Sequence, residues 1–232
     1  MIMVELLAGA GVALICGLDR VAMLQILISR PIVAAPLTGL LLGEPLIGLQ
    51  IGVMVELLWL ARLPVGAAVP PDDTQVAVGA SVLAVALGRE LGATSPEMML
   101  VSLLIALPLG KVGQYCDHRA RLYNGRLPDL TEQAVSEGQF GRAQLLHLRG
   151  LLSFSLAALL TYCFIVFGGL LVIPFVWSLI AVPLGYSSGF LQLALPLVGV
   201  AVILGTINVS RSITLFCASF GMAFLLMWLV QQ

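Results

Sequence analysis

Charged residues are scarce in this 232-residue sequence and make up 10% of it. Soluble domains carry about 25% charged residues, so this chain cannot cover its surface with solvated side chains. Apolar residues make up 60% of the sequence, and the mean hydropathy is +1.08. We therefore expect an all-α, polytopic membrane protein embedded in a lipid bilayer. The net charge of −1 favours neither an acidic nor a basic partner, and no basic, aromatic-interleaved patch predicts nucleic-acid binding.

Residue types that carry catalysis are also rare, with two histidines and four cysteines in the whole sequence. His118 and His147 both lie in one polar segment, and the cysteines are scattered without the spacing of a metal site. The glycine motif GAGVAL at 9–14 lacks the third glycine of a phosphate-binding loop. We expect no catalytic residue, no metal and no cofactor, and a protein that is not an enzyme on its own.

The apolar runs predict about seven to nine helical segments, several of them short or broken. A bilayer core of about 30 Å needs about 20 helical residues, and some of the runs fall short of that length. The expected segments are residues 2–18, 21–43 with an interruption at 29–31, 46–60, 73–89, 97–115, 150–173, a proline- and glycine-rich piece to about 188, 189–208 and 211–230. No low-complexity linker divides the chain, so we expect one membrane domain over residues 1–232.

The polar stretch 111–149 holds six of the eleven basic residues. Cytoplasmic segments of membrane proteins accumulate Lys and Arg, which predicts that this stretch faces the cytoplasm. Its apolar residues recur at roughly helical spacing, which favours interfacial helices. A plain solvated loop is the alternative.

The segment VELLWLARLPVGAAVPPDDT, residues 55–74, predicts a break in the membrane helices. Three prolines in LPVGAAVPP remove backbone donors, so the helix ends there. It restarts at Asp72 or Asp73, since aspartate is a good N-cap residue. Irregular backbone at membrane depth survives only where protein or water covers it, and transporters place substrate sites at such broken helices. The pattern therefore predicts a re-entrant hairpin with a substrate site.

Glu56 lies in the middle of the apolar run IGVMVELLWL. A charge at that depth costs about 2.5–3.5 kcal/mol on insertion scales, so the carboxylate needs a wet cavity or a basic partner. Arg30 and Arg62 are the candidate partners for a purely structural ion pair. Carboxylates accept hydrogen bonds from the hydroxyls of a sugar, which makes Glu56 and Asp72 candidate substrate ligands. Asp73 is assigned a structural role beside them.

A second polar break, LGTINVSRSITLF at 204–216, lies in the C-terminal half. The amide of Asn208 can both donate to and accept from a sugar hydroxyl. Arg211 is expected to reach an interface or to pair with an acid. Our hypothesis is that the two breaks converge on one site.

Several of these stretches resemble one known family. They are SRPIVAAPLTGLLLGE (29–44), GLQIGVMVELLWL (48–60), VGAAVPPD (65–72), DHRARLYNGRL (117–127) and INVSR (207–211). In order and spacing they are similar to the IIC membrane subunit of the mannose/fructose/sorbose family of the bacterial phosphotransferase system (PTS).

The resemblance implies a hexose-translocating subunit of the inner membrane. Such subunits pair with a membrane subunit called IID, the pairs gather as trimers, and a core moves against a scaffold in an elevator-like way. Cytoplasmic IIA and IIB components phosphorylate the sugar. The family pattern nominates Glu56, Asp72 and Asn208 as sugar-handling residues. The glutamine that the family commonly carries three residues before the Arg of "RP" is Leu27 here, and Gln25, two residues earlier, is the candidate for its role.

Two other functions remain open on the sequence. One is a non-transporting membrane anchor or sensor that recruits cytoplasmic phosphotransfer proteins through residues 111–149. The other is an independent ion-coupled transporter.

Overall fold

The computed structural model describes residues 2–60, 70–92, 96–206 and 212–230. These residues form α1 (Ile2–Val21), α2 (Pro31–Leu41), α3 (Pro45–Trp59), α4 (Asp73–Glu90), α5 (Pro96–Leu109), α6 (Lys111–Asn124), α7 (Leu127–Ser136), α8 (Phe140–Thr206) and α9 (Ser212–Val230). No strand occurs within the described ranges. The prediction of an all-α protein with about seven to nine helical segments is confirmed.

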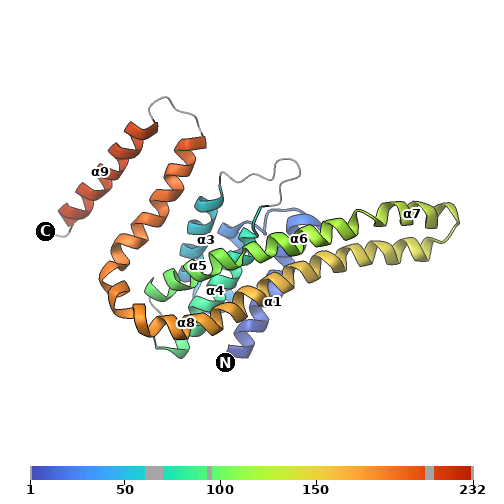
Figure 1. Cartoon of the computed structure of the whole chain (residues 1–232), viewed down its shortest axis with the longest axis horizontal. Helices are drawn as coiled ribbons and strands as arrows, with labels where there is room; N and C mark the ends of the chain where they lie inside the picture. Colours follow the sequence, from blue (N-terminus) through green and yellow to red (C-terminus); the bar gives the residue numbers. More distant parts are fainter. Residues whose placement is uncertain (1, 61–69, 93–95, 207–211, 231–232) are drawn as a thin grey trace.

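Helix α4 is the centre of the bundle (Figure 1). Every residue from Thr74 to Gly88 is buried. Its sequence is apolar on all sides, the pattern of a helix that is surrounded by others. The helices packed around it are α1, α2, α3, α5 and α8.

Helices α2 and α3 form a short hairpin beside α4. Their 11 and 15 residues correspond to about 16 and 22 Å, less than the bilayer core of about 30 Å. The two helices approach closely because glycines face the contact: a Cβ on Gly48 would collide with the backbone of Ala35. The short length of α3 agrees with the prediction for segment 46–60, but its pairing with α2 was not predicted. Residues 21–43 were expected as one interrupted segment, whereas α2 begins only at Pro31 and residues 22–30 form a loop. Most of the loop of the predicted re-entrant hairpin, residues 61–69, lies outside the described residues.

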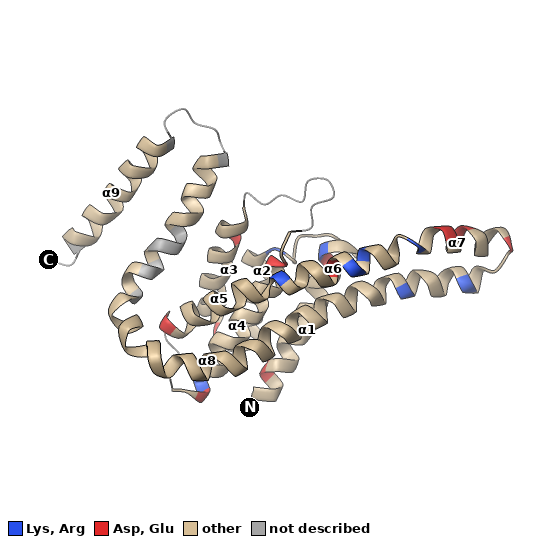
Figure 2. Cartoon of the chain, viewed as in Figure 1, with Lys and Arg blue, Asp and Glu red and all other residues tan. Residues whose placement is uncertain are grey.

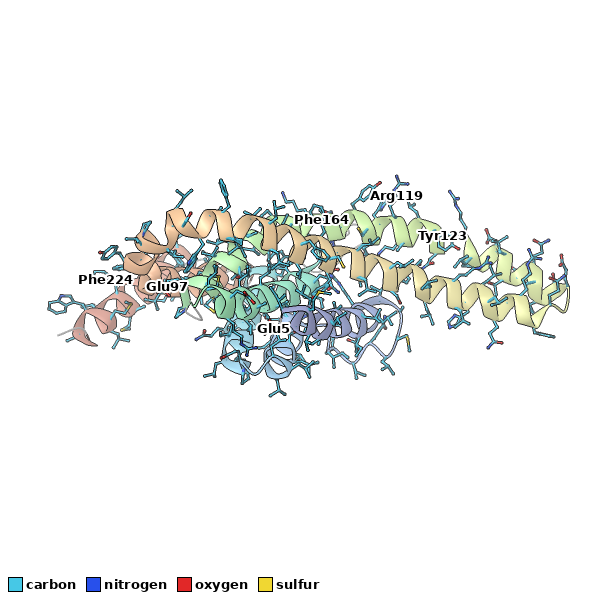
Figure 3. The ribbon with its side chains drawn as sticks, turned by 90° about the horizontal axis from the view of Figure 1, so that it is seen from below. Glu5, Glu97, Arg119, Tyr123, Phe164 and Phe224 are labelled. Carbon is cyan, nitrogen blue, oxygen red and sulfur yellow. The ribbon has the colours of Figure 1, made fainter. Side chains whose placement is uncertain are left out.

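Three ion pairs join α1 to α4 and its N-cap, two at one end of the antiparallel helices and one at the other. At one end Arg20 of α1 pairs with Asp72 and Asp73. At the other end Arg89 Nη1 donates to Glu5 Oε1 at 2.6 Å, and Arg89 also donates to the carbonyl of Leu42. Glu5 lies in the first turn of α1 and is labelled in Figure 3. Sequence analysis predicted none of these three pairs.

Three of the described helical stretches are long and apolar enough to cross a membrane. They are Ile2–Val21, Pro96–Ser136 and Phe140–Ser187. Shorter apolar helices are Pro31–Leu41, Pro45–Trp59 and Ile213–Leu229. The expectation of a polytopic membrane protein that mixes long and short helices agrees with these lengths.

Helix α8 differs from the sequence prediction. Residues 150–173, the piece to 188 and 189–208 were expected as separate segments, but residues 150–206 lie in one helix of 67 residues, α8. Figure 1 shows that α8 bends sharply in its orange section and then runs beside α9, away from α4. Pro174 and Pro183 lie inside this helix. Proline in a helix interior kinks the helix as well as ending it, so these prolines bend α8 without dividing it.

Helices α6 and α7 and the first part of α8 form an arm that projects from the bundle (Figure 1). Lys, Arg, Asp and Glu are spread along this arm, whereas the described part of α9 carries none (Figure 2). Arg119 of α6 points outward from it (Figure 3), and Tyr123 is exposed. The prediction of helices within 111–149 is confirmed, and their position at a membrane interface stays a prediction.

Candidate substrate cavity

A cavity of about 270 Å³, here called the Glu56 cavity, lies where α1, α3, α4 and α6 meet the loop between α1 and α2. Both acidic and basic side chains reach its wall. The described residues that line it are Arg20, Leu27, Ser29, Arg30, Glu56, Trp59, Leu60, Pro70, Asp73, Thr74, Asp117 and Arg121.

Glu56 lies on the wall of this cavity and is paired with Arg30. Arg30 Nη2 donates to Glu56 Oε1, and the backbone N–H of Ile32 lies 3.4 Å from Oε2. The Glu56 side chain is 12% exposed and the Arg30 side chain 45%. Of the two basic partners that the sequence offered, Arg30 is the one observed, and Arg62 lies outside the described residues. The carboxylate therefore has both an ion-pair partner and access to the cavity.

Asp72 and Asp73 lie at the start of α4, and both pair with Arg20. They line different cavities. Asp72 is the N-cap of α4: its Oδ1 accepts from the backbone N–H of Gln75 at 3.0 Å and also from Arg20 Nη1. Asp72 is buried and lines a narrow gap of about 20 Å³ beside Gly113. Asp73 Oδ1 lies 3.2 Å from Arg20 Nη2, and Asp73 lines the Glu56 cavity. The predicted restart of the helix at an aspartate cap is confirmed, with Asp72 as the cap.

Helix α6 closes one side of the cavity, which sequence analysis did not foresee. The backbone N–H of Asp72 donates to the carbonyl of Gly110, and a Cβ on Gly113 would collide with the side chains of Asp72 and Thr161. Because α6 begins so close to the α4 cap, Asp117 and Arg121 reach the cavity. Arg121 Nε donates to Asp117 Oδ2 at 2.9 Å. Their opposite charges four residues apart indicate a pair on one face of a helix, but not its position beside the cap of α4.

Gln25, the candidate for the role of the family's glutamine, is not brought to this cavity. Gln25 is exposed, its Nε2 lies 3.4 Å from the carbonyl oxygen of Val21, and it is not among the lining residues. Asn208 and Arg211 lie outside the described residues. The structure thus gathers Glu56, Arg30 and Asp73 in one place, with Asp72 behind them.

Within the described ranges, no group of three or more His, Cys, Asp or Glu side chains is placed to hold a metal ion. Each carboxylate described above is held by an arginine, a backbone amide or both. Carboxylates accept hydrogen bonds and guanidinium groups donate them, so the cavity wall offers both acceptors and donors.

Comparison with known proteins supplies the family. Residues 3–230 match the family described as EII-Sor, the PTS system sorbose-specific IIC component. The sorbose-specific EIIC component of Klebsiella pneumoniae is 28% identical over 122 residues, which cover 53% of this chain and 43% of that protein. The mannose-specific EIIC component of Escherichia coli K12 is 26% identical with the same coverage. In these matches the chain spans less than half the length of the curated relatives.

Two solved structures have a similar fold. One is described as a membrane protein and has a TM-score of 0.66 at 19% identity, covering 95% of this chain and 86% of the other. The other is a cryo-EM structure of the mannose transporter ManYZ in complex with microcin E492, with a TM-score of 0.59 at 20% identity and the same coverage. Together with the apolar helices, these matches identify a multi-pass protein of the bacterial inner membrane. The chain belongs to the family of PTS sorbose-specific IIC components.

Proposed function

We propose that this chain is the sugar-translocating IIC subunit of a phosphoenolpyruvate-dependent phosphotransferase system and that it carries a hexose across the inner membrane. The observation that carries the proposal is the Glu56 cavity, where three carboxylates and three guanidinium groups from α1, α3, α4, α6 and the α1–α2 loop line one space. Membership of the sorbose-specific IIC family supports it. Relatives named for sorbose and for mannose nominate those two sugars as the first to test.

The cavity has the size and chemistry for one monosaccharide. Its volume of about 270 Å³ lies just under the range of about 300–1,000 Å³ that is usual for pockets of larger ligands. Glu56 and Asp73 accept hydrogen bonds from hydroxyls, and Arg20 and Arg30 donate them. Trp59 and Leu60 add apolar surface for the C–H face of a sugar ring. Asp72 does not line the cavity in this proposal, but its ion pair with Arg20 keeps the Arg20 guanidinium in place.

The partners of the proposed function are a IID membrane subunit and cytoplasmic IIA and IIB components. IID completes the transport unit, and pairs of IIC and IID assemble as trimers. IIB phosphorylates the hexose on the cytoplasmic side. In this proposal the basic arm faces the cytoplasm, so α6 brings Asp117 and Arg121 to the cytoplasmic mouth of the Glu56 cavity. The whole of residues 1–232 acts as one membrane domain.

Uptake of radiolabelled mannose and of radiolabelled sorbose tests the proposal. The chain is expressed with its IIA, IIB and IID partners in a strain that lacks its own uptake systems for these sugars. We expect phosphoenolpyruvate-dependent uptake of at least one sugar and, in Glu56→Gln, a loss of about 100-fold or more, because the amide cannot replace the charged acceptor.

Glu44→Gln is the matched control. Glu44 lies at the opposite end of α3, where its side chain makes no capping hydrogen bond, so this variant keeps wild-type uptake. Uptake of neither sugar by a fully assembled wild-type complex would instead favour a membrane anchor or sensor. Uptake that persists without IIA and IIB would favour an ion-coupled transporter.

A further inference from the structure

The loop between α1 and α2, residues 22–30, has an unusual backbone. Leu24, Gln25 and Leu27 have φ angles of +57°, +53° and +70°, in the left-handed region that residues with a Cβ rarely adopt. Leu24 and Leu27 are also largely exposed, so their own packing does not impose this conformation. Such a backbone persists only where neighbouring groups hold it, and it is typical of functional segments.

Asp19 is the group that holds this loop. Its side chain is buried, with 3% of the residue exposed. Oδ1 accepts from the backbone N–H of Ile26 at 2.8 Å, and Oδ2 accepts from that of Ser29 at 3.0 Å. The two oxygens of one carboxylate thus fix two points of the loop that are three residues apart.

The far end of the same loop is part of the Glu56 cavity. Ser29 and Arg30 line the cavity. The carbonyl of Ser29 accepts from Thr74 Oγ1 at 2.7 Å, and Arg30 pairs with Glu56. Asp19 itself is not among the described lining residues. Its carboxylate therefore reaches the cavity only through the backbone that it holds.

We propose that Asp19 is a positioning residue of the sugar site: by fixing the left-handed loop, it sets Ser29 and Arg30 on the cavity wall and so determines affinity for the hexose without touching it. This inference rests on the proposed function. It assigns a role to a residue that lies outside the cavity and that neither the family pattern nor the broken helix pointed to. In this proposal the geometry of the α1–α2 loop at the sugar site depends on the buried carboxylate of Asp19.

The test compares Asp19→Asn with Glu5→Gln in the assembled complex. Both variants replace a buried carboxylate of α1 by its amide, but Glu5 pairs with Arg89 at the opposite end of the helix. Initial rates of mannose and sorbose uptake give KM and the maximal rate for each protein. We expect Asp19→Asn to raise KM about tenfold, since one loop amide loses a charged acceptor, with the maximal rate within about twofold of wild type. Glu5→Gln keeps the wild-type KM.

Two further measurements separate positioning from general damage. Hydrogen exchange at the amides of Ile26 and Ser29 is expected to accelerate in Asp19→Asn and to stay unchanged in Glu5→Gln. Adding Leu24→Gly to Asp19→Asn is expected to lower KM again, because glycine adopts a positive φ without steric cost. This rescue would not occur if the variant had simply lost stability.

An unchanged KM in Asp19→Asn would overturn the inference, whether or not loop exchange accelerates. A raised KM with unchanged exchange and no rescue by Leu24→Gly would also overturn it, since the effect would not pass through the loop. A wild-type complex without saturable uptake of either sugar would overturn the proposed function and this inference together. The wild-type result therefore distinguishes the two failures.

Discussion

Arg30 of the α1–α2 loop and Glu56 of α3 form an ion pair on the wall of a cavity inside the helical bundle. The pair gives the acid of an apolar helix its partner, and attraction to Arg30 offsets part of the cost of burying the Glu56 carboxylate. Both Glu56 and Arg30 also line the Glu56 cavity, so the paired carboxylate and guanidinium groups face it together. Structural pairing and ligand binding are therefore two properties of one contact.

This contact predicts strong coupling between the two residues. Arg30→Gln and Glu56→Gln should each lower the free energy of unfolding by about 1–3 kcal/mol, less than for a fully buried pair because Arg30 is partly exposed. The double variant should cost less than the sum of the single ones by about 1 kcal/mol. Thermal unfolding of the purified complex in detergent provides the measurement. Additive single effects would show that the pair contributes no interaction energy.

The two aspartates at the start of α4 should separate into different roles. Asp72→Ala loses both the cap and the Arg20 contact, whereas Asp72→Asn keeps a good capping side chain, so the alanine variant should be less stable by about 1 kcal/mol. Asp73→Asn should leave the unfolding temperature near that of wild type.

Sugar uptake should also distinguish the Asp72 and Asp73 variants. Because Asp73 lines the cavity, Asp73→Asn should raise KM by about tenfold through loss of a charged acceptor. If Asp73→Asn left KM unchanged while Asp72→Asn raised it, the assignment of the cavity wall to Asp73 would be wrong.

The ion pair at the other end of α1 and α4 should matter for stability alone. Arg89→Ala leaves the buried carboxylate of Glu5 without its cation, a change that costs about 3–5 kcal/mol for a buried pair. The fraction of complex that folds should then transport with the wild-type KM. A raised KM in the assembled fraction would link this distant pair to the cavity and contradict the separation of the two ends.

Two glycine substitutions should have opposite effects. Gly48→Ala places a Cβ against the backbone of Ala35, and overpacking of this kind typically costs about 1–3 kcal/mol. Gly11→Ala meets nothing within 4 Å and should be neutral or stabilising by up to about 1 kcal/mol, since alanine favours helix over glycine. The unfolding temperatures of the two variants measure this difference in stability. Equal destabilisation would mean that α2 and α3 do not pack as described.

The sequence predicted the features that depend on local chemistry. Scarcity of charge predicted the membrane class, the apolar run 46–60 predicted the extent of α3, and an aspartate predicted the cap of α4. The need of Glu56 for a partner followed from its place in an apolar run, and Arg30 was one of two candidates. Each of these follows from a side chain and its immediate neighbours in the chain.

Features that depend on which helices meet were not predictable in the same way. Asp117 and Arg121 belong to a polar stretch, and nothing in their spacing indicates that α6 starts against the cap of α4. That approach depends on Gly113, whose missing side chain leaves room for Asp72. The continuous α8 was missed because proline signals a break but does not tell whether a helix ends or bends.

A structure of the assembled complex with a bound hexose tests the central claim most directly. We predict the sugar in the Glu56 cavity, with its hydroxyls within hydrogen-bonding distance of Glu56 and Asp73 and its ring beside Trp59. A sugar bound elsewhere, with Glu56 still held by Arg30 and the cavity filled by protein side chains, would contradict the account.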